Sequence, residues 1–463
     1  MAEALAPATS DPLQTALAAT GLDLGLVTDP DQLARFTTDA TRRVAATPSL
    51  VIRPADTAGV SAALRLCQEA GRRVVLQGGL TGLSGGARVQ PGEVVLSLER
   101  MTAIGPVDDL AAQIEVGAGA TLQQVQEAAA ASGLIFGVDL GARGSATIGG
   151  MIATNAGGIR VLRYGMMRAQ VAGIEAVLAD GTVITAMKGL EKDNAGPDLR
   201  QLFIGSEGTL GVVTRALLRL HPAPTVETNA LCAVDSVEAA QALLRHLRAR
   251  LGPLLSAYEG IWPEVYEGAC ALTCNPPLPT GAGLYVLTEI QGMREILQED
   301  AFEAALIEAY EAGLCRDVVV SQSARDHDRL WALREACVDF TFSLGNLLPH
   351  DLSLPARALP AFLAEARTRL AEVDPQAGVY IYGHLGDGNL HYIVKTEART
   401  EVSAALNGLA ARLGGSITAE HGVGQDKAPY LSMVRSEQER LVMTRLKAAM
   451  DPAELLNAGR VLG

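Results

Sequence analysis

The sequence lacks any apolar run long enough to cross a membrane, and its N-terminus has no basic segment followed by an apolar one. A membrane-spanning helix requires about 18 or more consecutive apolar residues. Asp11 interrupts the segment in which a secretory signal would lie, so we expect none. These absences predict a cytoplasmic protein, whose contact with a membrane would at most be peripheral.

Basic residues and cysteines are also scarce. The chain carries 38 Lys and Arg against 52 Asp and Glu, a formal charge of −14, and no stripe rich in Lys and Arg. This balance argues against a nucleic acid as the partner. The six cysteines show no disulfide framework, and Cys270 with Cys274, the one close pair, has no second pair to complete a zinc site. We therefore expect reduced thiols.

Apolar residues and glycine are abundant. Apolar residues make up 48% of the chain, charged residues 19%, and glycine occurs 48 times, so a sizeable core is possible. A length of 463 residues corresponds to two large domains or about three smaller ones. We expect a polar, helical leader at 1–44, a first domain at 45–223 and a second domain at 224–463.

The apolar periodicity of the first domain alternates between strands and helices. An amphipathic helix is predicted where Val60, Ala63, Leu64 and Cys67 fall on one face. A further helix of this domain is predicted at 121–131, and helices of the second domain are predicted at 236–251 and 295–313. The predicted strands are 50–53, 74–76, 94–96, 113–116, 174–178 and 182–184, and Asp180-Gly181 predicts a hairpin between the last two.

Three glycine-rich segments lie in the first domain, at 77–86, 141–158 and 204–211. Successive small residues let backbone N–H groups converge on an anion, so such loops hold a diphosphate without basic side chains. One such segment is equally compatible with a surface turn, and three together favour a diphosphate site.

The segment 114–122 resembles a Rossmann fingerprint, since it runs from a strand into a helix with Asp139 downstream. Its last motif position is Leu122, where close packing of helix on strand requires Gly or Ala. We therefore do not expect a nicotinamide cofactor.

His384 and His391 flank Asp387-Gly388, between runs predicted as the strands 379–382 and 390–394. A two-residue turn would place His384 opposite His391, with Cβ atoms roughly 4.5–5.5 Å apart. Glu420 would then add an oxygen ligand, giving two imidazoles, one carboxylate and an open position for a substrate. Opposed histidines are also common as ordinary core or surface residues, so the hairpin alone leaves both interpretations open.

Five motifs in this order, at 78–83, 148–158, 205–211, 383–391 and 420–424, resemble those of the FAD-dependent D-2-hydroxy acid dehydrogenases. This family is of the vanillyl-alcohol-oxidase type and includes D-lactate, D-2-hydroxyglutarate and glycolate-oxidase-subunit enzymes. The resemblance implies an α+β fold with a two-subdomain FAD-binding domain. It also implies a C-terminal substrate domain with an antiparallel sheet and covering helices, and a tail that returns to the flavin.

The resemblance also implies which residues contact FAD. The expected cofactor residues are Gly78, Gly79, Leu80, Thr81, Gly82, Gly85, Gly86, Gly144, Ser145, Gly149, Asn155, Glu207 and Asn457. Some relatives tether the flavin through His or Cys. Neither residue occurs between Cys67 and Asn155, so we expect non-covalent FAD. For Asn457 a simple helix C-cap is the alternative.

In the substrate domain the resemblance assigns His384, His391 and Glu420 to a divalent metal, zinc. His421 becomes the general base, since imidazole titrates near working pH. Arg334 becomes a bidentate clamp for the substrate carboxylate. Tyr382 and Asn389 are expected to contact either the substrate or the side chains that bind it. Without the resemblance, Arg334 would be a helix-surface arginine and Glu420-His421 a helix cap.

One position departs from the family. Pro349 stands where several relatives carry a lysine for the acid, which puts tight binding of a dicarboxylate in doubt unless His350 substitutes for that lysine.

The resemblance predicts oxidation of a D-2-hydroxy acid, of the D-2-hydroxyglutarate or D-lactate type, to the 2-oxo acid by hydride transfer to flavin N5. The expected electron acceptor is an electron-transfer flavoprotein or a quinone, and the expected assembly is a homodimer. The alternatives are an oxidase that uses oxygen and a non-catalytic flavoprotein subunit for electron transfer. A subunit of that kind should lack the metal and base residues, all of which are present.

Overall fold

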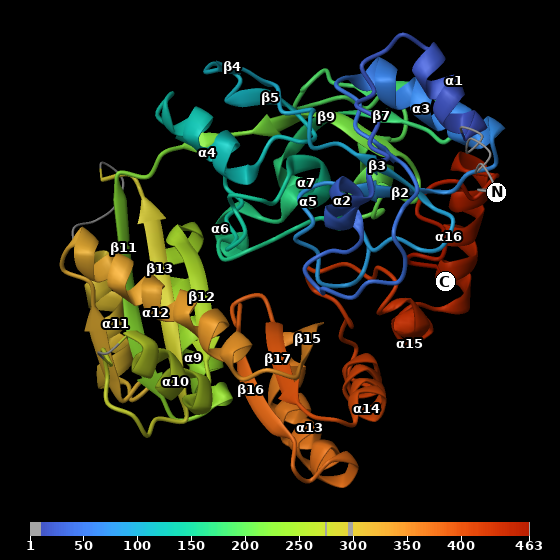
Figure 1. Cartoon of the computed structure of the whole chain (residues 1–463). Helices are drawn as coiled ribbons and strands as arrows, with labels where there is room; N and C mark the ends of the chain where they lie inside the picture. The colour runs from blue at the N-terminus through green and yellow to red at the C-terminus, as the bar shows by residue number, and fades with distance from the viewer. Residues whose placement is uncertain (1–10, 274–275, 295–299, 463) are drawn as a thin grey trace.

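The computed structural model describes residues 11–462, except 274–275 and 295–299. Helices and mostly antiparallel sheets are arranged in an N-terminal and a C-terminal body (Figure 1). The predicted α+β fold class is confirmed.

A small parallel sheet of order β1-β3-β2 opens the N-terminal body. Its strands are β1 (Val51–Ile52), β2 (Val74–Gln77) and β3 (Val94–Ser97). Between β1 and β2 lies α3 (Thr57–Glu69), which begins where the Asp56 carboxylate accepts the Gly59 N–H at 2.8 Å. The predicted stripe of α3 is buried against this sheet, so that prediction is confirmed.

The leader differs from its prediction. Its described part, from residue 11 on, contains only short helical segments, α1 (Pro12–Ala19), α2 (Pro30–Leu33) and the 3-10 turn η1 (Ala34–Phe36). It is not polar throughout, because Leu13 and Leu17 of α1 lie one turn apart and pack into the core of the parallel sheet.

A five-stranded antiparallel sheet of order β4-β5-β9-β7-β8 completes the N-terminal body. Its strands are β4 (Ile104–Asp108), β5 (Gln113–Gly117), β7 (Val171–Val177), β8 (Val183–Ala186) and β9 (Val212–Arg219). β6 (Leu134–Ile135) pairs separately with β10 (His221–Pro222). The helices here are α4 (Leu122–Ala130), α5 (Ile148–Thr154), α6 (Val161–Tyr164), α7 (Met167–Gln170) and α8 (Arg200–Phe203). β5 lies antiparallel between β4 and β9, so its turn into α4 is not part of a parallel βαβ unit.

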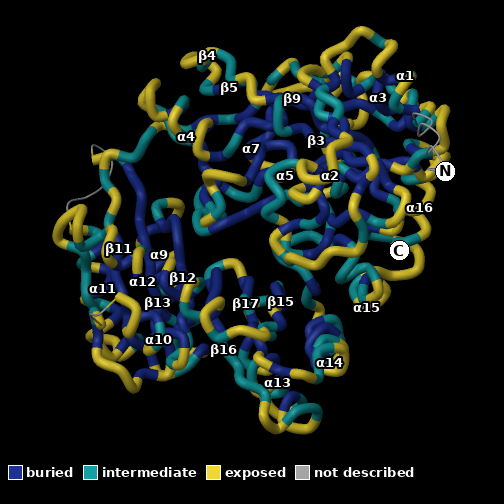
Figure 2. Tube along the Cα trace, viewed as in Figure 1, coloured by how far each residue is buried: buried dark blue, intermediate teal, exposed yellow. Residues whose placement is uncertain are grey.

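The C-terminal body is built on a seven-stranded antiparallel sheet of order β14-β11-β13-β12-β16-β17-β15. Its strands are β11 (Val226–Val234), β12 (Leu255–Ile261), β13 (Leu284–Gly292), β14 (Asp317–Val320), β15 (Leu347–Ser353), β16 (Gly378–Gly383) and β17 (Asn389–Lys395). Figure 2 shows these strands largely buried between exposed helical surfaces.

Helices cover both faces of this sheet. One face packs on α9 (Val237–Leu251), α11 (Ala301–Glu311), α13 (Leu359–Val373) and α14 (Arg399–Arg412), with the 3-10 turns η2 (Gly252–Leu254) and η3 (Ala356–Ala358) nearby. The other face packs on α10 (Pro263–Thr273) and α12 (Ala324–Ser343). We call the second one the α12 face.

The last segment returns to the N-terminal body. It runs through η4 (Ala428–Tyr430), α15 (Leu431–Val434) and α16 (Glu437–Met450), and α16 lies beside the N-terminal helices (Figure 1). The tail then adds to the parallel sheet, where Val74 N–H donates to Leu455 O at 2.8 Å and Asn457 N–H to Val74 O at 2.9 Å. The two bodies are therefore fastened together at the chain end.

Within the described residues no helix is both long and apolar enough for a membrane span. The five described cysteines are free and buried.

A substitution of Arg460, in the tail, tests whether the tail fastens the two bodies together. It is 2% exposed, and its guanidinium contacts both oxygens of Glu93, at 2.7 and 2.9 Å, and Gly86 O at 2.8 Å. Arg460→Ala should lower the free energy of unfolding by about 3–5 kcal/mol, because Glu93 would remain as an uncompensated buried charge. Urea unfolding measures the change.

Arg435→Ala is the control, since Arg435 pairs with Glu439 while half-exposed and such pairs contribute little. Equal unfolding energies for the two variants would contradict the fastening role of Arg460.

Candidate active site

β16 and β17 form a hairpin whose register differs from the predicted one. Tyr382 pairs with His391, so the prediction that His384 stands directly opposite His391 is wrong by two residues. The connecting loop is longer than a two-residue turn because it is tied to the neighbouring strand, where Gly386 N–H donates to Tyr258 O at 3.0 Å.

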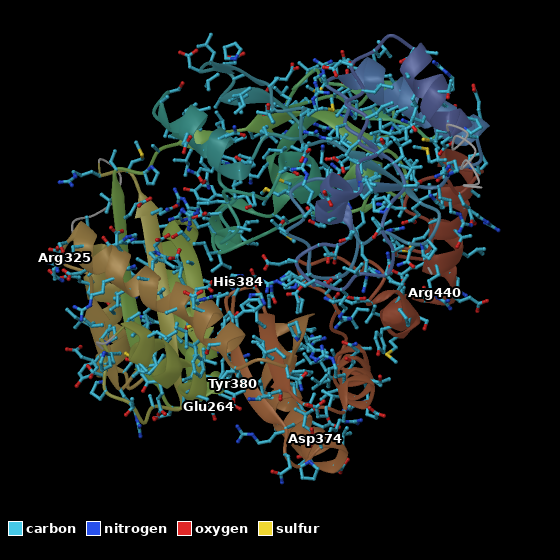
Figure 3. The ribbon with its side chains drawn as sticks, viewed as in Figure 1. Glu264, Arg325, Asp374, Tyr380, His384 and Arg440 are labelled. Atoms are coloured by element: carbon cyan, nitrogen blue, oxygen red, sulfur yellow. The ribbon has the colours of Figure 1, made fainter. Side chains whose placement is uncertain are left out.

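The two imidazoles nevertheless meet, because the longer loop folds His384 back towards His391. Their ring centroids are 5.3 Å apart. His384 is 6% exposed, and its Nδ1 lies 2.7 Å from Glu259 Oε1, while its Nε2 lies 3.4 Å from Glu420 Oε2. Figure 3 shows His384 at the end of the sheet that faces the N-terminal body.

His391 and His421 share one carboxylate. His391 Nδ1 lies 3.8 Å from Asp351 Oδ1, and His421 Nδ1 lies 3.6 Å from Asp351 Oδ2. The two rings are stacked, with centroids 5.9 Å apart and planes 10° from parallel. His421 is the more open of the pair, with a side chain 25% exposed, so its Nε2 is free to face a ligand.

Asp351 also builds the turn that carries Glu420 and His421. Its Oδ2 accepts the backbone N–H groups of Ala419, Glu420 and His421 at 3.1, 2.8 and 2.9 Å. An ionised carboxylate that accepts several N–H groups is strongly favoured. Burial opposes that charge, but the charges of His421, Lys427 and His391 and these N–H groups lower the pKa of Asp351.

Arg334 approaches the same cluster from α12. It is 5% exposed, and among the described residues its one hydrogen bond runs from Nε to Glu259 Oε2 at 2.8 Å. Its guanidinium carbon lies 4.8 Å from the centroid of the Tyr382 ring, and that ring lies 5.1 Å from the His391 ring. Arg334 thus lies in the cluster where the sequence analysis expects a clamp, and neither of its terminal nitrogens has a hydrogen bond to the described residues.

Glu420 connects the cluster to the N-terminal body. Its Oε1 accepts the backbone N–H of Gly158, in the second glycine-rich segment, while its Oε2 faces His384. The predicted site residues of the C-terminal body therefore lie at its edge next to the second glycine-rich segment, which ends at Gly158.

Neighbouring charges shift the pKa values of His384, His391 and Glu420 in different directions. Burial would lower the pKa of His384, but the charges of Glu259 and Glu420 outweigh it and raise that pKa well above its usual value. Burial and the neighbouring charge of His384 lower the pKa of His391 to about 3. Burial opposes the ionised form of Glu420, but His384 lowers its pKa to about 2. At neutral pH His391 is therefore uncharged and Glu420 ionised.

Two groups of described side chains have ligand atoms close enough to hold a metal ion, His384 with His391 and Glu420, and Asp351 with His391 and His421. In each group the ligand atoms lie within 4.8 Å of one another. Two imidazoles and a carboxylate suit zinc. Each group keeps one carboxylate oxygen for a ligand, since Asp351 Oδ1 has no hydrogen-bond partner among the described residues and Glu420 Oε2 faces His384. The first group is the one that the sequence predicts.

Asn389 adds an unpaired polar atom to this region. It is 3% exposed, and its Oδ1 is buried with no hydrogen-bond partner among the described residues. Buried polar atoms rarely lack partners, so Asn389 is available to a ligand of the cluster.

The first two glycine-rich segments touch each other. A Cβ on Gly78 would overlap the hydroxyl oxygen of Thr147, and a Cβ on Gly79 would overlap the carbonyl oxygen of Ser145. Only glycine permits this approach. The contact brings two of the loops expected to hold a diphosphate into one surface.

The third segment and the tail join the same surface. Glu207 Oε1 and Oε2 accept the N–H groups of Val423 and Gly424 at 2.6 and 2.8 Å. Asn457 accepts Leu76 N–H at 2.9 Å and donates to Glu207 O at 2.7 Å. Glu207 and Asn457 therefore hold the loops together through their side chains instead of pointing freely at a cofactor.

Some expected cofactor residues have other contacts. Gly149 packs against Ala118, where a Cβ would come within 2.8 Å. Asn155 caps α5 in a left-handed conformation, and its Oδ1 accepts Arg168 N–H at 2.9 Å. Strained positions of this kind gather at ligand sites, and the positive φ angles of Leu80, Asn155, Glu207 and Asn457 fit that pattern.

His350 does not take the place of the lysine that Pro349 replaces. Side chains alternate along β15, so His350 lies on the face away from Asp351. Its Nε2 lies 3.3 Å from Ser403 Oγ on α14, and burial lowers its pKa to about 4. The expectation that His350 assists with the acid is wrong for this reason.

Sequence reasoning missed Glu259 and Asp351, the two carboxylates behind the histidines. Glu259 is 1% exposed and is the one charged residue of the strand Leu255–Ile261. A carboxylate buried in an apolar strand is rarely without a partner. The single charged residue in this apolar run is therefore a sequence signal that would have identified Glu259. Asp351 directly follows His350 and gave no comparable signal.

Comparisons with known proteins identify the family of the chain. Residues 48–187 match the family described as FAD binding domain, and residues 223–461 match FAD linked oxidases, C-terminal domain. A D-2-hydroxyglutarate dehydrogenase of Xanthomonas citri is 39% identical over 450 residues, 95% of this chain and 94% of the relative. The mitochondrial D-2-hydroxyglutarate dehydrogenase of Bos taurus is 37% identical over 446 residues, 94% of this chain and 81% of the relative.

Solved structures share the fold at low identity. A p-cresol methylhydroxylase superimposes with a TM-score of 0.77 at 17% identity, covering 98% of both chains. An alkyldihydroxyacetonephosphate synthase gives 0.74 at 15% identity, covering 98% of this chain and 86% of the other.

The clasp between Glu207 and the turn at 422–424 is testable. Glu207→Gln keeps one acceptor oxygen and loses the other, so one backbone N–H is left without a partner at a cost of about 1–3 kcal/mol. Hydrogen exchange in residues 418–427 should therefore become faster. Glu191→Gln is the control, because Glu191 is 78% exposed and contacts Arg219 at 3.6 Å. Unchanged exchange in the Glu207 variant would show that the clasp does not hold this turn.

Proposed function

Because the chain belongs to the FAD-linked oxidases, an oxidoreductase family, we propose that it oxidises a D-2-hydroxy acid, of the D-2-hydroxyglutarate or D-lactate type, to the 2-oxo acid. The single observation that carries this proposal is the meeting of His384, His391, Glu420, His421 and Arg334 beside the glycine-rich segments. The relatives named D-2-hydroxyglutarate dehydrogenase support the substrate class.

Two bound groups would supply chemistry that side chains lack. FAD, held non-covalently by the glycine-rich segments, would accept the hydride and pass the electrons to an electron-transfer flavoprotein or a quinone. A divalent metal, zinc in this proposal, would be held by His384, His391 and Glu420 and lower the pKa of the substrate hydroxyl.

The remaining steps belong to the chain itself. The terminal nitrogens of Arg334 would bind the substrate carboxylate. His421 would take the hydroxyl proton at Nε2. The Asp351 carboxylate, 3.6 Å from Nδ1, would stabilise the imidazolium that forms. Tyr382 and Asn389 would position the substrate from the same face of the sheet.

Anaerobic reduction of the flavin by a panel of D- and L-2-hydroxy acids tests the proposal. We expect the yellow FAD absorbance to bleach with D-2-hydroxyglutarate or D-lactate and not with the L-enantiomers. A flavoprotein that no D-2-hydroxy acid reduces would contradict the proposal, and rapid reoxidation by oxygen alone would favour an oxidase.

Removal of the metal should stop turnover and leave FAD in place, because the proposed ligands lie in the C-terminal body. His384→Ala, His391→Ala and Glu420→Ala should each abolish metal binding, measured as metal per flavin by elemental analysis. Cys67→Ala, a buried cysteine outside the cluster, should keep the parental metal content. Full activity in a metal-free preparation would remove the Lewis-acid role.

Kinetics should separate the base from the clamp. His421→Ala should lower kcat by about 10²–10⁴-fold with a smaller change in KM, because a positioned base acts in the transition state. Arg334→Lys keeps the charge but loses the planar fork, so it should chiefly raise KM. Stopped-flow flavin reduction measures both.

His246→Ala is the matched control for His421→Ala, because His246 lies on α9 against Ala305 O and Glu308, far from the cluster in sequence and on the other face of the sheet. It should reduce its flavin at the parental rate. Parental flavin reduction in the His421 variant would place the base elsewhere.

A further inference from the structure

We infer that Glu259 is the positioning residue of this site and that it fixes the imidazole of His384 and the guanidinium of Arg334 at the same time. The inference rests on the proposed function, in which His384 is a metal ligand and Arg334 binds the substrate carboxylate. Glu259 itself touches neither the metal nor the substrate.

Each oxygen of Glu259 has its own partner. Oε1 lies 2.7 Å from His384 Nδ1, and Oε2 accepts from Arg334 Nε at 2.8 Å. The side chain is 1% exposed, so water does not compete for either oxygen. A buried carboxylate with two charged or polar donors is fully satisfied by them.

This contact determines which nitrogen of His384 faces the cluster. An ionised carboxylate only accepts hydrogen bonds, so the imidazole donates from Nδ1 and presents Nε2, on the side of Glu420, as the ligand atom. A carboxylate behind a ligating histidine fixes the ring and its tautomer and strengthens the ligand.

The same carboxylate determines the plane of the Arg334 guanidinium. The group is planar, so a bond from Nε to Oε2 and the stacking on Tyr382, 4.8 Å from the guanidinium carbon, together set where both terminal nitrogens point. Metal ligand and carboxylate clamp thus share one support, and a shift of Glu259 displaces both.

The backbone around Glu259 is rigid where this support is needed. Gly260 pairs with Gly383, the residue before His384, and Tyr258 O accepts Gly386 N–H at 3.0 Å. Glu259 therefore stands between two anchors of the loop that carries His384. A site supported on a central strand holds its geometry more closely than one supported on a loop.

The neighbouring strand supplies a matched control. Glu289 on β13 is equally buried and lies on the same α12 face, opposite Ala257. Its oxygens contact Arg160, His327, Trp331 and Ser256. None of these residues belongs to the cluster, so loss of the Glu289 carboxylate disturbs the fold to a similar degree without touching the site.

The experiment compares Glu259→Gln with Glu289→Gln in the FAD-loaded full chain. Gln accepts with one oxygen only, so either His384 or Arg334 loses its acceptor. Competition between the protein and a chromogenic chelator for Zn²⁺ measures metal affinity, and KM and kcat are measured for the best D-2-hydroxy acid. We expect Glu259→Gln to weaken Zn²⁺ binding by about 10–100-fold and to raise KM, with FAD content unchanged.

Glu289→Gln should lower the melting temperature as Glu259→Gln does, yet keep the Zn²⁺ affinity within about twofold, since no ligand loses its support. Glu259→Asp retains the charge and is the second variant should the Gln variant fail to fold. Its shorter side chain reaches one partner at most, so it should still impair Zn²⁺ binding or KM.

Two failures are distinguishable. In the first, the parental protein binds Zn²⁺, but the Glu259 variants keep its affinity and KM, or Glu289→Gln weakens Zn²⁺ binding equally. That result overturns the role of Glu259 and leaves the proposed function standing. If the parental protein binds no divalent metal, the metal role in the proposed function is overturned and the ligand-orienting role of Glu259 falls with it.

Discussion

A buried row of alternating hydrogen-bond donors and acceptors holds the candidate site together. It runs from Arg334 through Glu259 and His384 to Glu420, and ends at the backbone N–H of Gly158. Burying a single charge is costly, and removing one partner of a buried pair leaves the other uncompensated. Each member of the row therefore depends on its neighbours. The row also joins α12, the central strand β12, the hairpin loop and the N-terminal body, so the site and the interface between the bodies form together.

A second set of contacts supports the row from behind. Asp351 holds the turn that carries Glu420 and His421 through three backbone N–H groups, and Glu207 accepts two more from the residues that follow. Asn457 ties Glu207 to β2. The loops expected to hold FAD and the turn expected to hold the base are thus parts of one hydrogen-bonded structure, which fixes the position of one body relative to the other.

The sequence predicted what depends on local patterns. The α3 stripe and the strands of the histidine hairpin follow from periodicity and turn residues, because these interactions lie within a few positions of each other. The hairpin register was wrong because it depends on Tyr258 of another strand. Glu259 was missed because its partners lie 75 and 125 positions away. The face of His350 depends on the register of β15 with β17, which local sequence does not encode.

Diffraction at a zinc absorption edge, from crystals of the FAD-loaded protein, tests the central claim most directly. The arrangement of Glu259, His384 and Glu420 predicts one anomalous peak, about 2.0–2.2 Å from His384 Nε2 and from a Glu420 oxygen, with His391 as the third protein ligand. His384 Nδ1 should stay on Glu259. A peak between Asp351, His391 and His421 instead, or no peak in the cluster at saturating zinc, would contradict the account.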